Sequence, residues 1–99
     1  RCRTCKTIEA YTREALQTAF PQDIQSGLLE FMSVNIDNAE NSHFVTDYQL
    51  VTRSVVIAEF VDGKQVRWKR LDGVWNVAGN KDAFFAYVQP EVRAWLRSN

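Results

Sequence analysis

Apolar residues recur at the spacing of an α-helix across residues 7–20. The stripe comprises Ile8, Tyr11, Ala15, Leu16, Ala19 and Phe20. These offsets fall on one face of a helix with about 3.6 residues per turn, and polar residues occupy the other face. Pro21 cannot continue a helix, because it lacks a backbone N–H and its ring clashes with the preceding turn. We therefore expect a helix over residues 7–20 and a polar connection over residues 22–27.

The next apolar run, residues 28–36, has the composition of a β-strand. Its apolar residues are Leu28, Met32, Val34 and Ile36 on one parity and Leu29 and Phe31 on the other. Apolar side chains on both faces are typical of a parallel strand that is covered on both sides. Asp37 and Asn38 can then cap a second helix, which we expect over residues 39–48.

Two β-prone runs, residues 55–61 and 64–70, flank the pair Asp62-Gly63. A two-residue Asp-Gly connection is a strong signal for a β-hairpin, because glycine tolerates the positive φ that the turn needs. The second run alternates apolar and charged residues, as an edge strand with one wet face does. Its cations are Lys64, Arg67, Lys69 and Arg70. They could bind an anion, but a solvated edge is the interpretation we favour.

The last third of the chain predicts helices. Residues 71–79 are typical of a turn with a short helical piece, and Asn80 can cap a helix that runs to the C-terminus. Pro90 lies inside that helix and should either kink it near Ala86 or restart it.

Composition narrows the class of protein. The chain has 99 residues, 45% of them hydrophobic, so we expect one folded domain with a core. Lysine plus arginine and aspartate plus glutamate are equal at 12 each, which gives no case for nucleic acid or an anionic membrane as the main partner. No apolar run approaches the ~20 residues of a membrane-spanning helix. Because the chain begins with Arg1, we expect a processed product or a fragment.

The chemistry of the sequence is concentrated in its first six residues. Cys2 and Cys5 are the only cysteines and have C-x-x-C spacing, with Arg1, Arg3 and Lys6 around them. A helix N-terminus and nearby cations both favour thiolate over thiol and can lower a cysteine pKa to about 3.5–7.5. We expect Cys2, at the outer end, to be the attacking thiolate and Cys5 to be the resolving cysteine.

Other interpretations of the pair remain open. Cys2 and Cys5 could form a structural disulfide, although a bridge across so short a loop stabilises little. They could also hold a soft ion such as Cu(I) or As(III). A closed zinc site needs four ligands, and His43 is the only other soft or nitrogen ligand, so this site is disfavoured. A third interpretation is a purely structural or interaction domain, in which the thiols have no role.

The order of C-x-x-C, helix, strand, helix, hairpin and helix resembles a thioredoxin-like domain of the α/β class over the whole chain, residues 1–99. Residues 48–55 (YQLVTRSV) stand where thioredoxins carry the loop before the next strand. More narrowly, Cys2-x-x-Cys5 with residues 7–15 (TIEAYTREA), 44–50 (FVTDYQL) and 63–69 (GKQVRWK) is similar to bacterial proteins described as a nitrophenyl-compound nitroreductase subunit. These proteins tend to be encoded near arsenic-resistance genes.

The resemblance implies a thiol–disulfide or metalloid-linked role, without a cofactor beyond the dithiol, and favours the cell envelope or periplasm over the cytoplasm. No flavin-binding motif supports nitroreductase activity. Two departures matter. The strand that precedes C-x-x-C in thioredoxins is missing, so we expect a truncated, rearranged or intertwined fold that could form a homodimer. The cis-proline is also missing, and Ser54 and Val55 stand at its place.

The sequence therefore predicts a thiol–disulfide oxidoreductase whose partner is a protein disulfide or dithiol. In this reaction Cys2 attacks the partner disulfide, and Cys5 resolves the mixed disulfide. The alternative function is a redox, metalloid-binding or Cu(I)-binding accessory subunit without exchange catalysis.

Overall fold

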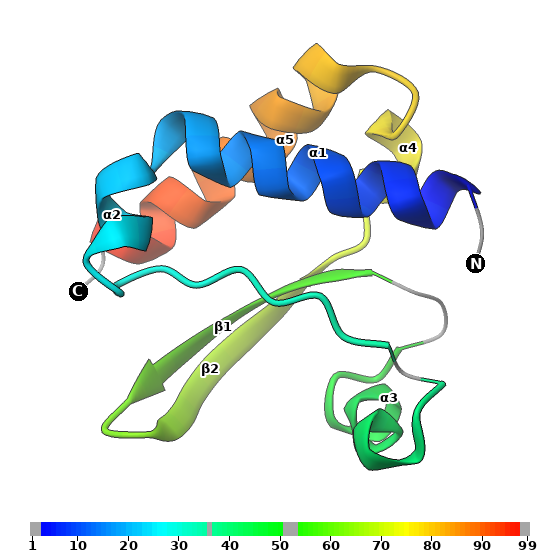
Figure 1. The fold of residues 1–99 in the computed structure, drawn as a ribbon, viewed down its shortest axis with the longest axis vertical. Helices are drawn as coiled ribbons and strands as arrows, with labels where there is room; N and C mark the ends of the chain where they lie inside the picture. The colour runs from blue at the N-terminus through cyan, green and yellow to red at the C-terminus, as the bar shows by residue number, and fades with distance from the viewer. Residues whose placement is uncertain (1–2, 36, 51–53, 98–99) are drawn as a thin grey trace.

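The computed structural model describes residues 3–35, 37–50 and 54–97. This part of the chain forms an α+β domain in which five α-helices and a short 3-10 helix accompany one two-stranded sheet (Figure 1). The elements are α1 (Arg3–Ala19), α2 (Pro21–Gln25), η1 (Ala39–Asn41), α3 (His43–Asp47), β1 (Val55–Val61), β2 (Lys64–Leu71), α4 (Val74–Val77) and α5 (Lys81–Arg97).

The core lies between α1, α4 and α5, with the base of the hairpin closing one side (Figure 1). Its most buried side chains are Ile8, Leu16, Phe20, Leu71, Val74, Ala78, Phe84, Val88 and Val92. Tyr11 meets Phe84 edge to face, with ring centroids 5.5 Å apart. Gln89 donates a hydrogen bond from Nε2 to the Ala15 carbonyl across 3.0 Å, which ties α5 to α1. The amphipathic stripe predicted for the first helix is thus the face that packs into this core.

The predicted hairpin is confirmed. β1 and β2 are antiparallel, with Val55 opposite Leu71 at the base and Val61 opposite Lys64 at the tip. The turn places Asp62 at φ 54° and Gly63 at φ 80°, so both turn residues are left-handed, as a type I′ turn requires. Because the base packs on the helices while the tip extends into solvent, the two ends of the hairpin have different environments.

The strand predicted over residues 28–36 is wrong for the part that the structure describes, because residues 28–35 form no strand. Leu29 and Phe31 pack against the core, whereas Leu28 and Met32 are exposed. A strand needs a neighbour that completes its ladder of hydrogen bonds, and no described segment takes that position beside these residues. Composition alone indicated extended backbone, but pairing is decided by tertiary structure.

Three helix boundaries also differ from the predictions. Residues 21–25 form α2 instead of a polar connection, because Pro21 ends α1 and then serves as the first residue of a new helix. The helix expected over residues 39–48 is divided into η1 and α3. α5 runs from Lys81 to Arg97 without a break at Pro90. The predicted cap at Asn80 is confirmed, since its Oδ1 accepts a hydrogen bond from the Ala83 N–H at 3.1 Å.

The α/β thioredoxin arrangement expected from the resemblance is not seen among the described residues. Their sheet has only two strands, adjacent in sequence and antiparallel, where a parallel crossover was expected. Within the same residues, no helix combines the length and the apolar character needed to cross a lipid bilayer.

Candidate functional site

The candidate redox centre lies at the start of α1. This helix begins at Arg3, four residues earlier than predicted, so Cys5 lies in its first turn. Cys5 is disulfide-bonded and only 9% exposed. Cys2 is the only other cysteine of the sequence, and it lies outside the described residues together with Arg1. The sulfur of Cys5 is therefore oxidised and shielded from solvent.

The described surroundings of Cys5 are electropositive. Arg3 and Lys6 are exposed on the same turn, and neither forms an ion pair within the described part of the chain. The first turn of α1 contains no acidic residue. The positive dipole end of a 17-residue helix adds to this potential. The charges described on this turn are therefore all positive.

The structure places Ser54 and Val55 at the base of the hairpin. Ser54 donates its hydroxyl to Asp72 Oδ1 at 3.2 Å, and Val55 pairs with Leu71 at the first rung of the sheet. Val55 also packs against the hydrophobic core. These contacts explain both residues as parts of the scaffold, and a role beside the sulfurs stays a prediction.

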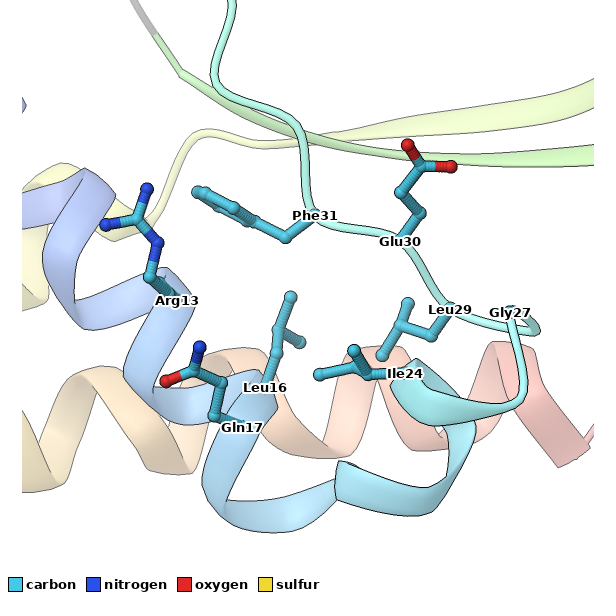
Figure 2. Close-up of a pocket in the computed structure, with 8 residues that line it drawn as sticks. All are labelled: Arg13, Leu16, Gln17, Ile24, Gly27, Leu29, Glu30 and Phe31. Carbon is cyan, nitrogen blue, oxygen red and sulfur yellow. The ribbon is translucent and has the colours of Figure 1, made fainter.

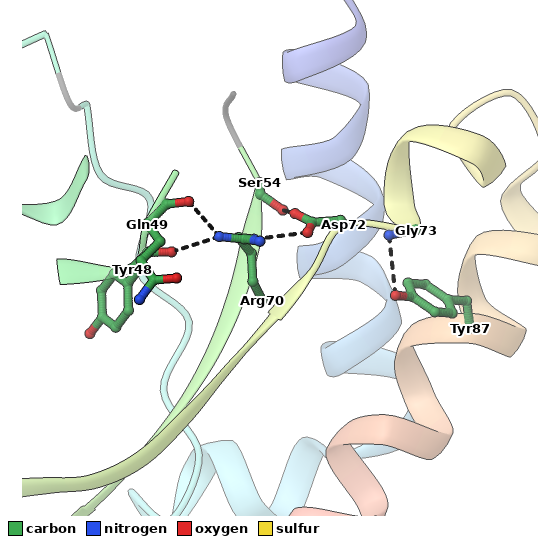
Figure 3. A network of polar contacts seen from close by, with 7 residues as sticks. All are labelled: Tyr48, Gln49, Ser54, Arg70, Asp72, Gly73 and Tyr87. Carbon is green, nitrogen blue, oxygen red and sulfur yellow. Dashed lines mark hydrogen bonds and ion pairs between the residues drawn. The ribbon is translucent and has the colours of Figure 1, made fainter. Parts of the chain in front are cut away.

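Arg70 organises a polar network that sequence reasoning missed (Figure 3). Its Nε donates to Asp72 Oδ2 at 2.8 Å, while its Nη1 donates to the Tyr48 carbonyl at 3.1 Å and to the Gln49 carbonyl. The guanidinium thus fastens the end of α3 to β2. The pattern of alternating charges indicated only an edge strand, because the carbonyls that Arg70 binds lie some twenty residues away in sequence.

The other cations of β2 are mostly paired, which argues against an anion-binding site. Arg67 forms an ion pair with Glu59 and stacks over Trp95, with 4.0 Å from its Cζ to the ring centroid. Lys69 binds Glu91 with an N–O distance of 3.0 Å. A carboxylate therefore already neutralises the charges of Arg67 and Lys69.

His43 has a local partner, Asp47. Its Nδ1 lies 2.7 Å from Asp47 Oδ2, one helical turn away, and both side chains are more than half exposed. Among the residues that the structure describes, no group of three or more His, Cys, Asp or Glu side chains could hold a metal ion. The described residues therefore add no further ligand to a metal site at Cys5.

The phenol of Tyr48 is hydrogen-bonded, and its pKa is raised. Its Oη donates to Gln65 Oε1 at 2.6 Å, and its ring meets Trp68 edge to face. Partial burial, and secondarily the nearby carboxylate of Asp47, raise the pKa of Tyr48 above its ordinary value of 10.0. Since both causes disfavour the phenolate, Tyr48 remains a neutral hydrogen-bond donor at physiological pH.

An open pocket of about 490 Å³ lies away from the cysteine turn, between α1, α2 and the extended segment 27–31 (Figure 2). Its lining residues are Arg13, Leu16, Gln17, Ile24, Gly27, Leu29, Glu30 and Phe31. Arg13 covers the ring of Phe31, with 5.1 Å from its Cζ to the ring centroid. The sequence carried no signal for this pocket, because it arises from the unexpected path of residues 28–31.

Comparison with known proteins supplies no family assignment. The chain matches no protein-family model, no curated protein and no solved structure. Its function is therefore inferred from the chemistry of the residues themselves.

Proposed function

We propose that this protein is a thiol–disulfide exchange domain that uses Cys2 and Cys5. The observation that carries the proposal is the oxidised, shielded Cys5 on the electropositive first turn of α1. A buried inner cysteine suits the resolving role, since incoming partners cannot reach it directly. Arg3 and Lys6 are exposed without an ion partner among the described residues, so their charges are available to a thiolate.

The proposed reaction transfers two electrons from a dithiol to a disulfide. In the reducing direction, the Cys2 thiolate attacks one sulfur of the partner disulfide, and the other partner sulfur leaves as a thiolate that takes up a proton. The Cys5 thiolate then attacks Cys2 Sγ and expels the first partner sulfur. A Cys2–Cys5 disulfide remains, and the partner is released as a dithiol. The oxidised chain runs the same steps backwards when it accepts two electrons from a dithiol partner.

The thioredoxin-like relationship and the envelope location belong to this proposal. The C-x-x-C beside a helix start, followed later by a hairpin and a final helix, supports the relationship, although the described residues lack the parallel crossover of that fold. A disulfide-bonded Cys5 suits an oxidising compartment such as the periplasm, where disulfides persist.

The pH dependence of alkylation tests the proposal. After reduction, we expect Cys2 to react with iodoacetamide with a midpoint well below the ~8.5 of a free thiol. The protein should also reduce insulin with dithiothreitol as electron source, and Cys2→Ser should abolish this activity. A midpoint near that of a free thiol together with no insulin reduction would contradict the proposal.

A charge-matched pair of double variants separates local electrostatics from net charge. Arg3→Gln with Lys6→Gln should raise the alkylation midpoint by about 0.5 pH unit, because each nearby charge contributes a few tenths of a kcal/mol at an exposed helix end. Lys64→Gln with Arg97→Gln removes the same net charge from the hairpin tip and from the end of α5, and should leave the midpoint unchanged. Equal shifts in both double variants would assign the effect to net charge alone.

A further inference from the structure

Five consecutive residues between α2 and η1 have an unpaired backbone. Within the described chain, residues 30–34 neither donate nor accept a backbone hydrogen bond. The flanking residues are paired, since the Leu29 N–H binds the Asp23 carbonyl and the Asn35 carbonyl accepts from the Asn38 N–H. The segment runs extended past the hairpin (Figure 1). It therefore presents strand-like N–H and C=O groups without a neighbouring strand.

The side chains of this segment are divided between the core and solvent. Leu29 and Phe31 pack against the hydrophobic core, and Ser33 donates its hydroxyl to Glu9 Oε1 at 2.7 Å. These contacts hold the segment alongside α1. The opposite parity carries Leu28, Met32 and Val34, all exposed, with Met32 at 68%. The segment thus combines a fixed inner face, an apolar outer face and free backbone groups.

We propose that residues 28–35 form the interface of a homodimer, in which the segment pairs with the same segment of a second copy. Only another extended backbone offers donors and acceptors at the spacing of about 3.3 Å per residue that these groups need. A two-fold antiparallel pair makes the interface self-complementary and closed. This interface is independent of the cysteine chemistry.

Charge supports a second copy as the occupant. Glu30 is the only charged residue in segment 28–35. Two registers of the antiparallel pair differ in the position of the two-fold axis. If the two-fold axis passes beside Phe31, Glu30 lies opposite Met32 of the copy. If the axis passes beside Met32, Glu30 lies opposite Val34 of the copy. In neither register do two carboxylates meet, so the repulsion that opposes like charges on paired strands is absent.

The size of the contact sets the expected strength of the dimer. One strand pair of this length buries less than the ~1,200–2,000 Å² of a stable interface. We therefore expect a reversible dimer with a dissociation constant of about 10 μM to about 1 mM. The fraction of protein in the dimer should then rise with protein concentration.

Sedimentation equilibrium tests the proposal on the full chain over about 1 μM to about 1 mM protein. Met32→Glu should weaken self-association at least tenfold, because the new carboxylate faces Glu30 of the copy when the axis passes beside Phe31 and faces its own equivalent when the axis passes beside Met32. The matched control is Val66→Glu, which puts the same charge on another exposed apolar site, 55% exposed on β2. It should leave the association constant unchanged. A non-reducing gel excludes covalent dimers.

Amide hydrogen exchange supplies a second measurement that locates the interface. Amides of residues 30–34 should gain protection as protein concentration rises, and Cys2→Ser with Cys5→Ser should retain this gain. A monomer at every concentration would overturn the proposal. So would equal weakening by Met32→Glu and Val66→Glu, or self-association that leaves the amides of residues 30–34 unprotected.

Discussion

Gly73 shows how a tertiary contact restricts a single residue. It follows β2 and caps α4 with φ −63°, a conformation that any L-residue adopts. Its N–H donates to Tyr87 Oη at 3.2 Å (Figure 3). A Cβ at this position would lie 2.8 Å from Cζ of the Tyr87 ring. The need for glycine is therefore steric, whereas the sequence indicated only a turn with a short helical piece over residues 71–79.

We expect Gly73→Ala to lower the free energy of unfolding by about 1–3 kcal/mol, because the methyl group must displace the Tyr87 ring and its hydrogen bond. Urea denaturation followed by circular dichroism measures the change. Gly79→Ala is the matched control, since nothing lies within 4 Å of the position that its methyl group would take. It should change stability by less than about 1 kcal/mol in either direction. Equal losses in both variants would refute the steric explanation.

At the scale of elements, α5 contains a proline in its interior. Pro90 is exposed and lies at the tenth position of a 17-residue helix that continues to Arg97. A proline there removes one helical hydrogen bond and crowds the carbonyl of Ala86. The sequence predicted a kink or a restart. The helix does not restart at Pro90, and it continues because Phe84, Val88 and Val92, on both sides of Pro90, are buried in the same core.

We therefore expect Pro90→Ala to raise the free energy of unfolding by up to about 3 kcal/mol, since it restores the backbone donor without disturbing a buried side chain. Ala94→Pro, at another exposed position of α5, should lower it by about 3 kcal/mol or more. Thermal and urea unfolding measure both changes. A loss of stability in Pro90→Ala would mean that the helix packs through a bend that only proline maintains.

At the scale of the whole molecule, burial is distributed unevenly. The helices and the base of the hairpin share the core, while the tip of the hairpin carries exposed apolar residues. Phe84 is fully buried at the contact with Tyr11, whereas Phe60 near the hairpin tip is 59% exposed. The side chain of Phe84 therefore lies in the core, and that of Phe60 lies largely in solvent.

Truncation of each phenylalanine tests this distribution. Phe84→Ala should lower the free energy of unfolding by about 3–5 kcal/mol, a large part of the ~5–15 kcal/mol typical of a domain. Phe60→Ala should change it by about 0.5 kcal/mol or less. Urea unfolding of the two variants measures the difference. A comparable loss in Phe60→Ala would show that the tip of the hairpin is covered in solution, for instance by another copy.

The amino-acid sequence by itself determined the elements whose signals are local. The amphipathic first helix, the Asp62-Gly63 hairpin and the Asn80 cap depend on neighbouring residues, and all three were predictable. The sequence also placed Cys5 among cations beside the start of a helix, although the helix begins at Arg3, four residues before the predicted start. Short-range periodicity and turn chemistry carry such information without knowledge of the rest of the fold.

Tertiary structure decided the features that depend on distant partners. Residues 28–35 have the composition of a strand, but a strand forms only where a second backbone completes its hydrogen bonds, and none does so within the described chain. The carbonyls bound by Arg70, the ring that excludes a methyl group at Gly73 and the pocket beside Arg13 likewise depend on long-range approach. The sequence pattern indicates the local conformation that a residue favours, whereas packing determines which distant residues it contacts.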